Sequence, residues 1–324
     1  MSDASAARRR RRRTILRWTL TTVVVGVVGY FFATTLAANW TEVVEQGLEF
    51  SWLWVAATAL FALAVPFTGL LWARILRWLE PTARVSAREA TAVQAASWLL
   101  KYVPGQVGSV VNKVLWGGRK SISRMLIVIS FVYENVFLQL ASIAPSAIIL
   151  LVSLGPEIFG RNFTLLLLPV LILVPLALVA WKPLFHRAVN FAARRALKQE
   201  VPERYFLSTP RALVSAFEFI GPRVLNGIGF VLIAASVAEI TPAEWLPFAA
   251  AYVLAGAIGI LAVFVPSGIG VREAVIVLIL GQYIPTTEAI VIALLARLLS
   301  TLADALIALY YAAVRRTIPK EIRP

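Results

Sequence analysis

The sequence lacks cysteine altogether and contains a single histidine, His186, which lies in a basic segment. The absence of cysteine excludes disulfides, thiolate metal ligands and thiol nucleophiles. One histidine argues against a Ser-His-Asp triad and against a histidine-rich metal site. We therefore expect no cofactor, no metal ion and no enzyme activity built on these groups.

Charged residues are also scarce. They make up 15% of the chain, whereas soluble domains contain about 25%. Hydrophobic residues reach 60% and the mean hydropathy is +0.80, which excludes a cytosolic enzyme, a disordered scaffold and a small secreted domain. The composition predicts an all-α polytopic membrane protein with about 6–8 transmembrane helices.

Lysine and arginine outnumber the acidic residues, 31 to 17, and the formal net charge is +14. In so apolar a chain this excess indicates cytoplasmic loops facing anionic headgroups rather than nucleic acid. Basic residues cluster at 1–14, 74–124, 182–223 and 315–323, whereas the turns at 39–51 and 239–244 contain glutamates and no Lys or Arg. The positive-inside rule then predicts a multi-pass protein of the inner or plasma membrane with both termini cytoplasmic.

The domain organisation follows from these segments. Residues 1–14 are predicted to be a basic cytoplasmic tail, 15–313 a single transmembrane helical domain and 314–324 a second cytoplasmic tail. The apolar run 15–37 is longer than the 7–15 residues of a signal-peptide core, so we expect a retained helix. Further apolar spans are expected at about 52–75, 124–153, 163–181, 224–238, 245–265 and 288–313.

A short motif occurs twice, as Val103-Pro104-Gly105-Gln106-Val107-Gly108 and as Val265-Pro266-Ser267-Gly268-Ile269-Gly270. Each copy interrupts two apolar helical segments. The first copy, between 87–103 and 110–116, predicts a re-entrant hairpin whose two ends lie on one side of the membrane. An approach to the second copy from the other side would make the half-repeats, about 52–153 and 224–313, an inverted repeat.

A helix broken by proline and glycine exposes unpaired N–H groups where the next half-helix starts, and these attract anions. Paired interruptions of this kind indicate the central site of a transporter. The alternative is that both prolines only kink helices for packing. The functional hypothesis assigns lipid-headgroup or anion binding to Lys101, Pro104, Gly105, Gly108, Lys113, Pro266, Gly268, Gly270, Arg272 and Arg297.

Five ionisable residues lie where lipid is expected: Glu134, Arg272, Glu273, Arg297 and Asp304. Each costs about 2.5–3.5 kcal/mol at mid-bilayer, so such side chains face the bundle interior and pair. In one hypothesis Lys113, Arg272 and Arg297 form a cationic cavity for a phosphate, while Glu134, Glu273 and Asp304 neutralise it or carry a proton. In the other, Arg272, Arg297, Glu134 and Asp304 are structural ion pairs that hold helices together, and Lys101 and Lys113 are ordinary snorkelling residues. Arg297 and Asp304 are seven residues apart and share a helix face.

Lys101–Gly108 and Val265–Glu273 are similar to the K-Y-x-P-G-x-x-G and P-x-G-x-G-x-x-E elements of the lysylphosphatidylglycerol synthase transmembrane family, also called the flippase-like domain family. The resemblance implies a polytopic inner-membrane domain, which in multiple-resistance-factor proteins moves aminoacylated phospholipid between leaflets. Relatives are linked to polyprenyl-phosphate sugars and envelope glycolipids. We see neither a soluble synthase domain nor a glycosyltransferase domain, so synthase activity is not expected. Asn112-Lys113 stands where the family commonly has arginine.

The expected function is translocation or binding of an anionic phospholipid or a polyprenyl-phosphate-linked glycolipid, with membrane lipids as the partners and no nucleic acid. One alternative is a membrane enzyme that modifies lipid headgroups, for which Glu134, Glu273 and Asp304 are the only candidate catalytic groups. A second is a non-catalytic membrane partner of a cytoplasmic or membrane cell-envelope glycosyltransferase. The sequence leaves the oligomeric state open.

Overall fold

The computed structural model describes residues 49–102, 107–155, 182–197, 200–261, 270–322 and 324. Contacts divide the chain into two units, Met1–Glu49 and Phe50–Pro324, and the architecture below is that of the second. The predicted segments 15–37 and 163–181 lie outside the described residues. So do Pro104, Gly105, Pro266 and Gly268.

The described residues form helices and no strands, which confirms the all-α polytopic membrane fold. Five stretches in the described residues are long and apolar enough to cross a membrane. They comprise α3 (Trp52–Leu79), α6 (Arg124–Leu154), Glu203–Ala235, α12 (Pro242–Leu261) and α14 (Thr286–Val314). The third stretch contains α10 (Thr209–Glu218) and α11 (Ile220–Ala235).

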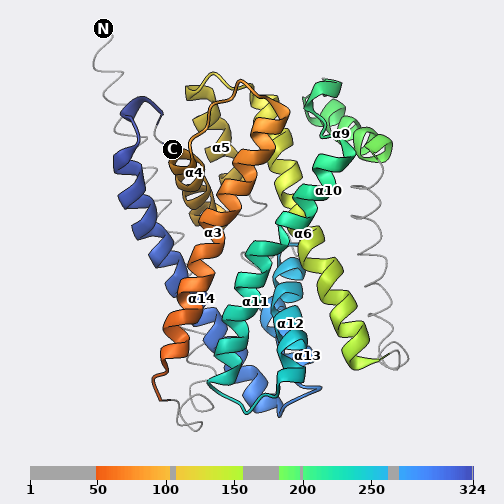
Figure 1. Ribbon diagram of the computed structural model, residues 1–324, viewed down its shortest axis with the longest axis vertical. Helices are drawn as coiled ribbons and strands as arrows, with labels where there is room; N and C mark the ends of the chain where they lie inside the picture. Colours follow the sequence, from red (N-terminus) through yellow and green to blue (C-terminus); the bar gives the residue numbers. More distant parts are fainter. Residues whose placement is uncertain (1–48, 103–106, 156–181, 198–199, 262–269, 323) are drawn as a thin grey trace. The chain divides into compact units, whose positions relative to one another are not determined.

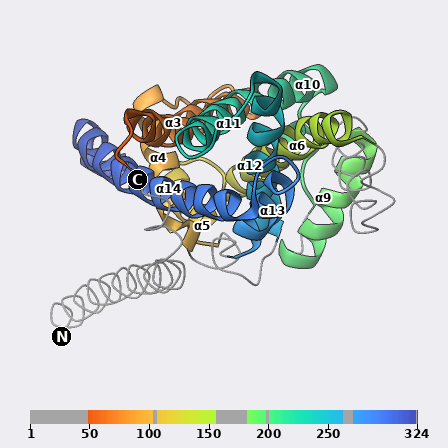
Figure 2. The same ribbon diagram turned by 90° about the horizontal axis from the view of Figure 1, so that it is seen from below.

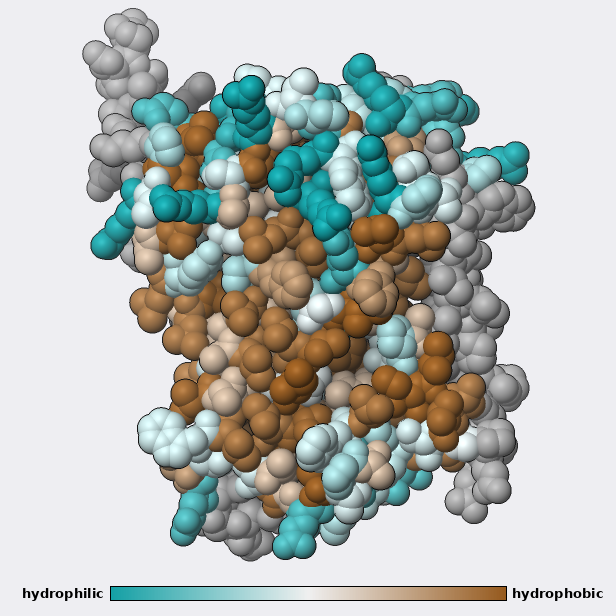
Figure 3. Space-filling model, in the orientation of Figure 1, coloured by the Kyte–Doolittle hydropathy of each residue, from teal (hydrophilic) through white to brown (hydrophobic). Residues whose placement is uncertain are grey.

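The two ends of the helical unit differ in charge. The end of α3 that carries Arg77 also holds Arg84, Lys120 and the start of α6, and we call it the basic end. The opposite end holds Glu239, Glu244 and Glu288, and we call it the acidic end. In the view of Figure 3, hydrophilic side chains gather at these ends and a hydrophobic band lies between them. Such a band is what lipid contact requires.

The first re-entrant hairpin consists of α4 (Ala87–Leu99), a 3₁₀ turn (Leu100–Tyr102) and α5 (Val107–Arg119). Each limb has 13 residues, or about 20 Å at 1.5 Å per residue, too short for a hydrocarbon core of about 30 Å. Its outer ends meet at the basic end, where Lys120 Nζ donates to Glu89 Oε1 at 2.7 Å and to the Arg84 carbonyl at 2.8 Å. The hairpin therefore enters and leaves on one side.

The capping box of α4 holds Glu89 in place: Ser86 Oγ accepts from the Glu89 N–H, and Glu89 Oε2 accepts from the Ser86 N–H at 2.8 Å. Burial alone would raise the pKa of Glu89. The Lys120 ammonium and the Ser86 hydrogen bonds outweigh burial, and the pKa lies below its usual range. The sequence pattern S-x-x-E thus begins the first limb at the basic end.

The second hairpin consists of α12 and α13 (Val271–Leu280). At ten residues, α13 is only about 15 Å long. The rings of Phe248, near the start of α12, and Tyr283, just after α13, lie edge to face with centroids 5.8 Å apart. Both outer ends therefore lie at the acidic end, and this hairpin enters from the side opposite to the first.

The two halves, α3–α4–α5–α6 and α11–α12–α13–α14, run in opposite directions (Figure 1). Helix α3 contacts its counterpart α11, α4 contacts α14, and their counterparts α12 and α6 contact each other. Figure 2 shows α3 and α11 side by side. Pro266 follows Pro104 by 162 residues, and α14 starts 162 residues after α6, at Thr286 and Arg124. The described helices thus have the arrangement of an inverted repeat.

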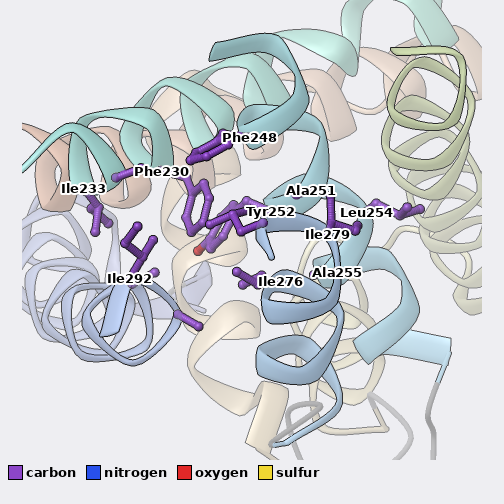
Figure 4. Close-up of a cluster of buried hydrophobic side chains, with 14 of the residues drawn as sticks. Phe230, Ile233, Phe248, Ala251, Tyr252, Leu254, Ala255, Ile276, Ile279 and Ile292 are labelled. Carbon is purple, nitrogen blue, oxygen red and sulfur yellow. The ribbon is translucent and has the colours of Figure 1, made fainter. Parts of the chain in front are cut away.

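A core of buried side chains joins the two halves and positions Tyr252 of α12 (Figure 4). The Tyr252 ring stacks on Phe61 of α3 and on Phe230 of α11, with centroids 5.2 and 4.8 Å away. Gly229 allows this packing, because a Cβ there would lie 2.8 Å from the Phe61 ring. Tyr252 therefore reaches the centre of the unit from a rigid aromatic stack.

The structure corrects one sequence prediction. Residues 182–223 were expected to form a cytoplasmic segment and the next span to begin at about residue 224. Only α9 (Lys182–Leu197) and the turn after it belong to the basic end, whereas α10 and α11 continue through Phe219 into one apolar stretch. Phe219 and Phe206 are buried against α6 and its neighbours, and this burial outweighs the basic composition. Arg223 consequently lies inside the third span.

Candidate functional site

Two groups of ionisable side chains lie within the apolar part of the described structure. One is the pair Lys113 of α5 and Glu134 of α6, which are 1% and 2% exposed. Lys113 Nζ donates a hydrogen bond to Glu134 Oε2, and Gln94 Nε2 of α4 donates to Glu134 Oε1 at 2.8 Å. The pair therefore ties both limbs of the first hairpin to α6.

Aromatic rings enclose this pair. Lys113 Nζ lies 4.4 Å from the ring centroid of Trp72 and 5.5 Å from that of Phe131. An ion pair this deeply buried costs desolvation, and removing one partner leaves an uncompensated charge. The sequence placed Lys113 with Arg272 and Arg297 around a phosphate. In the structure the partner of Lys113 is Glu134, an ion pair that the sequence analysis did not name.

The second group begins where the first hairpin meets α14. Lys101, in the 3₁₀ turn that follows α4, has its Nζ 2.8 Å from Asp304 Oδ1 and Oδ2. Trp98 Nε1 donates to the same carboxylate at 2.8 Å, and Lys101 Nζ lies 4.3 Å from the Trp98 ring centroid. The sequence predicted that Asp304 faces inward, which the structure shows, and the structure adds Lys101 as its partner.

Two further residues of the second group, Arg272 and Glu273, lie in the first turn of α13. Gly270 has φ +82°, a conformation that favours glycine, and its N–H donates to Glu273 Oε2 at 2.7 Å. Arg297 Nε of α14 lies 4.0 Å from Glu273 Oε1. The guanidinium carbon of Arg272 lies 5.3 Å from the centroid of the Tyr252 ring. The break before α13 therefore brings Arg272 and Glu273 to α12 and α14.

Arg223 completes this second group, and the sequence reasoning missed it. Arg223 lies seven residues before Phe230, on the same face of α11, and Phe230 stacks on the Tyr252 ring that Arg272 contacts. The Nε of Arg223 is buried and has no hydrogen-bond partner among the described residues. A signal existed in the sequence, since Arg223 stands between the apolar runs 212–217 and 224–235, but the neighbouring basic residues concealed it.

We call this second group the central charge cluster. It lies near mid-membrane, because Arg297 is 11 residues into α14 and Arg223 is 12 residues before the end of α11, or about 17 and 18 Å from the acidic end. Helices from both halves contribute to it. Gly108 lies in the first turn of α5, and no described contact links it to the cluster. The members are Lys101, Arg223, Tyr252, Arg272, Glu273, Arg297 and Asp304.

These features define a class of protein: a polytopic helical membrane domain in which two inverted halves, each with a broken hairpin, enclose charged residues. Residues 18–308 match the family model described as "Lysylphosphatidylglycerol synthase TM region". The chain belongs to this family, as its two motifs predicted, and is thereby a membrane protein linked to lipid and cell-envelope processes. No curated protein matches the sequence.

Proposed function

We propose that the protein moves an anionic lipid between the two leaflets of the inner membrane. The observation that carries this proposal is the central charge cluster, which joins helices of both inverted halves at mid-membrane depth. Transporters with inverted repeats bind their substrates at such a position, and one half then rocks against the other. The headgroup would contact Lys101, Arg272 and Arg297 while its hydrocarbon tails stay in lipid.

The carboxylates give the cluster a closed state without substrate. Asp304 neutralises Lys101, and Glu273 lies near Arg297. An arriving phosphate would compete for the same cations, so that these contacts open and re-form during each cycle. The Lys101–Asp304 pair joins the first hairpin to α14, and competition at this pair would couple headgroup binding to movement between helices of the two halves.

The orientation and partners belong to the same proposal. Under the positive-inside rule the proposal has the basic end, together with the C-terminal tail, facing the cytoplasm. Membrane lipids are the partners. A transport role is favoured over headgroup chemistry because the central charge cluster joins the two inverted halves, the position at which such transporters bind their substrates.

Reconstituted protein tests the proposal. Proteoliposomes containing headgroup-labelled phosphatidylglycerol or polyprenyl phosphate are treated with an impermeant quencher, and the fraction of inner-leaflet lipid that becomes accessible is followed in time. We expect faster exchange than in protein-free vesicles, and a loss of at least tenfold for Arg272→Gln. Arg211→Gln is the matched control, because Arg211 is an exposed residue near the basic end whose Nη1 donates to the Trp78 carbonyl at 3.4 Å.

Equal exchange rates with and without protein, for every lipid tested, would contradict the proposal. Conversion of the lipid to a new product by purified protein and an activated donor would favour the headgroup-modifying enzyme instead. Co-purification of a glycosyltransferase, together with absent exchange, would favour the membrane-partner hypothesis.

A further inference from the structure

The central charge cluster contains more positive than negative charge. Among the described residues the cluster has four cations, Lys101, Arg223, Arg272 and Arg297, and two carboxylates, Glu273 and Asp304, which leaves an excess of two positive charges. The buried pair Lys113–Glu134 is neutral as a whole and adds nothing to this sum. Tyr252 is the remaining titratable member of the cluster in the described part of the chain.

The excess is located at Arg223 and Arg272. Asp304 is held by Lys101 and Trp98, and Glu273 accepts from the Gly270 N–H and lies 4.0 Å from Arg297. Within the described residues, no carboxylate comes within 4.0 Å of the guanidinium of Arg223 or of Arg272.

Arg223 lies on the face of α11 that packs on Tyr252 through Phe230, and Arg272 lies on the same Tyr252 ring. Two like charges in this region repel each other and lose hydration at mid-membrane depth. Arg223 in addition has a buried Nε–H without an acceptor, which costs free energy unless a ligand supplies the acceptor. A phosphate removes all three penalties, because guanidinium groups bind phosphate oxygens in a bidentate manner. The number of charges that the ligand must bring is therefore two.

Resting on the proposed function, we infer that the lipid carries a headgroup with two negative charges, a phosphate monoester or a diphosphate, and that Arg223 and Arg272 bind it together. A phosphate monoester carries about −1.5 to −2 charges at pH 7, whereas a diester such as phosphatidylglycerol carries one. Lysyl-phosphatidylglycerol should bind most weakly of these lipids. Its two ammonium groups and one phosphate give the headgroup a net positive charge, which the two arginines would repel.

The inference is tested by binding, independently of transport. Purified full-length protein in detergent is titrated with polyprenyl phosphate, polyprenyl diphosphate, phosphatidylglycerol and lysyl-phosphatidylglycerol, and the affinities are measured by native mass spectrometry. We expect both dianionic lipids to bind about tenfold more tightly than phosphatidylglycerol. Binding of the monoester should strengthen as the pH rises from 5 to 7.5, through its second pKa near 6, while binding of phosphatidylglycerol should stay constant.

Variants test whether Arg223 and Arg272 cause the preference for the phosphate monoester over the diester. Arg223→Gln and Arg272→Gln should each reduce the ratio of monoester to diester affinity to within about twofold, and Arg223→Lys should keep part of it. Arg211→Gln should leave the ratio unchanged. If a glutamine variant fails to fold, the lipid preference and pH profile of the unaltered protein still decide the matter.

Equal affinities for the monoester and phosphatidylglycerol, or tighter binding of lysyl-phosphatidylglycerol, would overturn the inference even if vesicle experiments show lipid exchange. Displacement of the dianionic lipid by an equal concentration of inorganic phosphate would support the charge class, but it would assign the site to a soluble anion and count against lipid transport. Selective binding of dianionic lipid without any exchange would leave the inference standing and contradict only the proposed function.

Discussion

The two hairpins occupy corresponding positions in the inverted halves, but the basic residue of each hairpin has a different environment. In the first, Lys113 is sealed against Glu134 under Trp72 and Phe131, and the pair is almost inaccessible. In the second, Arg272 at the start of α13 is half-buried and lies on the Tyr252 ring, with no carboxylate within 4.0 Å among the described residues. One architecture therefore holds a neutral structural bond in one half and an excess of positive charge in the other.

This difference indicates that the halves have different tasks. A closed pair that links α5 to α6 keeps the first hairpin attached to its own half. In the proposed function, Arg223 and Arg272 of the second half bind the anionic headgroup, since no carboxylate lies within 4.0 Å of either guanidinium among the described residues. A substitution should therefore reduce stability in the first hairpin and reduce ligand binding in the second.

The largest expected effect is on the buried pair. Glu134→Ala leaves the Lys113 ammonium buried without a counter-charge, which should lower the free energy of unfolding by about 3–5 kcal/mol. Thermal unfolding in detergent measures this loss. Asn135→Ala is the matched control on the same helix, because the Asn135 amide only donates to the Phe131 carbonyl of its own helix. The double variant Lys113→Met with Glu134→Leu should recover most of the stability, and failure to do so would show that the pair is more than structural.

Next in size is the packing of α4 on α3. A Cβ at Gly69 would lie 2.7 Å from Gln94 Cβ and 2.9 Å from the Ala90 carbonyl oxygen, so Gly69→Ala should cost about 1–3 kcal/mol. It should also disturb the buried pair, since Gln94 donates to Glu134. Gly227→Ala, at the α11–α12 contact of the other half, meets only the Ala249 side chain below 3.0 Å and should cost less. Equal losses in the two unfolding curves would contradict this asymmetry.

Arg272→Gln tests the second hairpin, where we expect an effect on ligand binding rather than on stability. Because Arg272 has no carboxylate within 4.0 Å in the described structure, its removal should change the free energy of unfolding by less than about 1 kcal/mol. Headgroup binding should weaken about tenfold, or about 1.4 kcal/mol. Thermal unfolding and lipid titration of one preparation separate the two effects. A large loss of stability with unchanged headgroup binding would show that Arg272 has a structural role and does not bind the headgroup.

The smallest expected effect lies at the outer end of the first hairpin. The pKa of Glu89 is held below its unfolded value of about 4.5, so its ionised form stabilises the fold above pH 4.5 and this contribution is lost as the pH falls through the lowered pKa. Glu89→Gln should therefore cost less than about 1 kcal/mol at pH 7. Unfolding curves at several pH values should show the difference shrinking toward pH 3, and a constant difference would exclude ionisation as its cause.

Much of the fold was predictable because lipid imposes simple rules on sequence. Apolar length predicted α3, α6, α12 and α14 to within a few residues, and the two Pro-Gly motifs predicted where helices break. The inward position of Asp304 followed from the cost of charge in hydrocarbon. Arg223 was not predictable in this way, because a basic residue beside other basic residues resembles a loop until helix packing shows that α11 has already begun.

The sequence by itself determined that the chain is a helical membrane protein, where its helices break and which charges must find partners. These properties depend on composition and on local backbone chemistry. Only the tertiary structure decided the pairing: Lys113 with Glu134 and Lys101 with Asp304. The partners lie 21 and 203 residues apart along the chain, and which side chains meet across helices depends on the packing of the whole bundle.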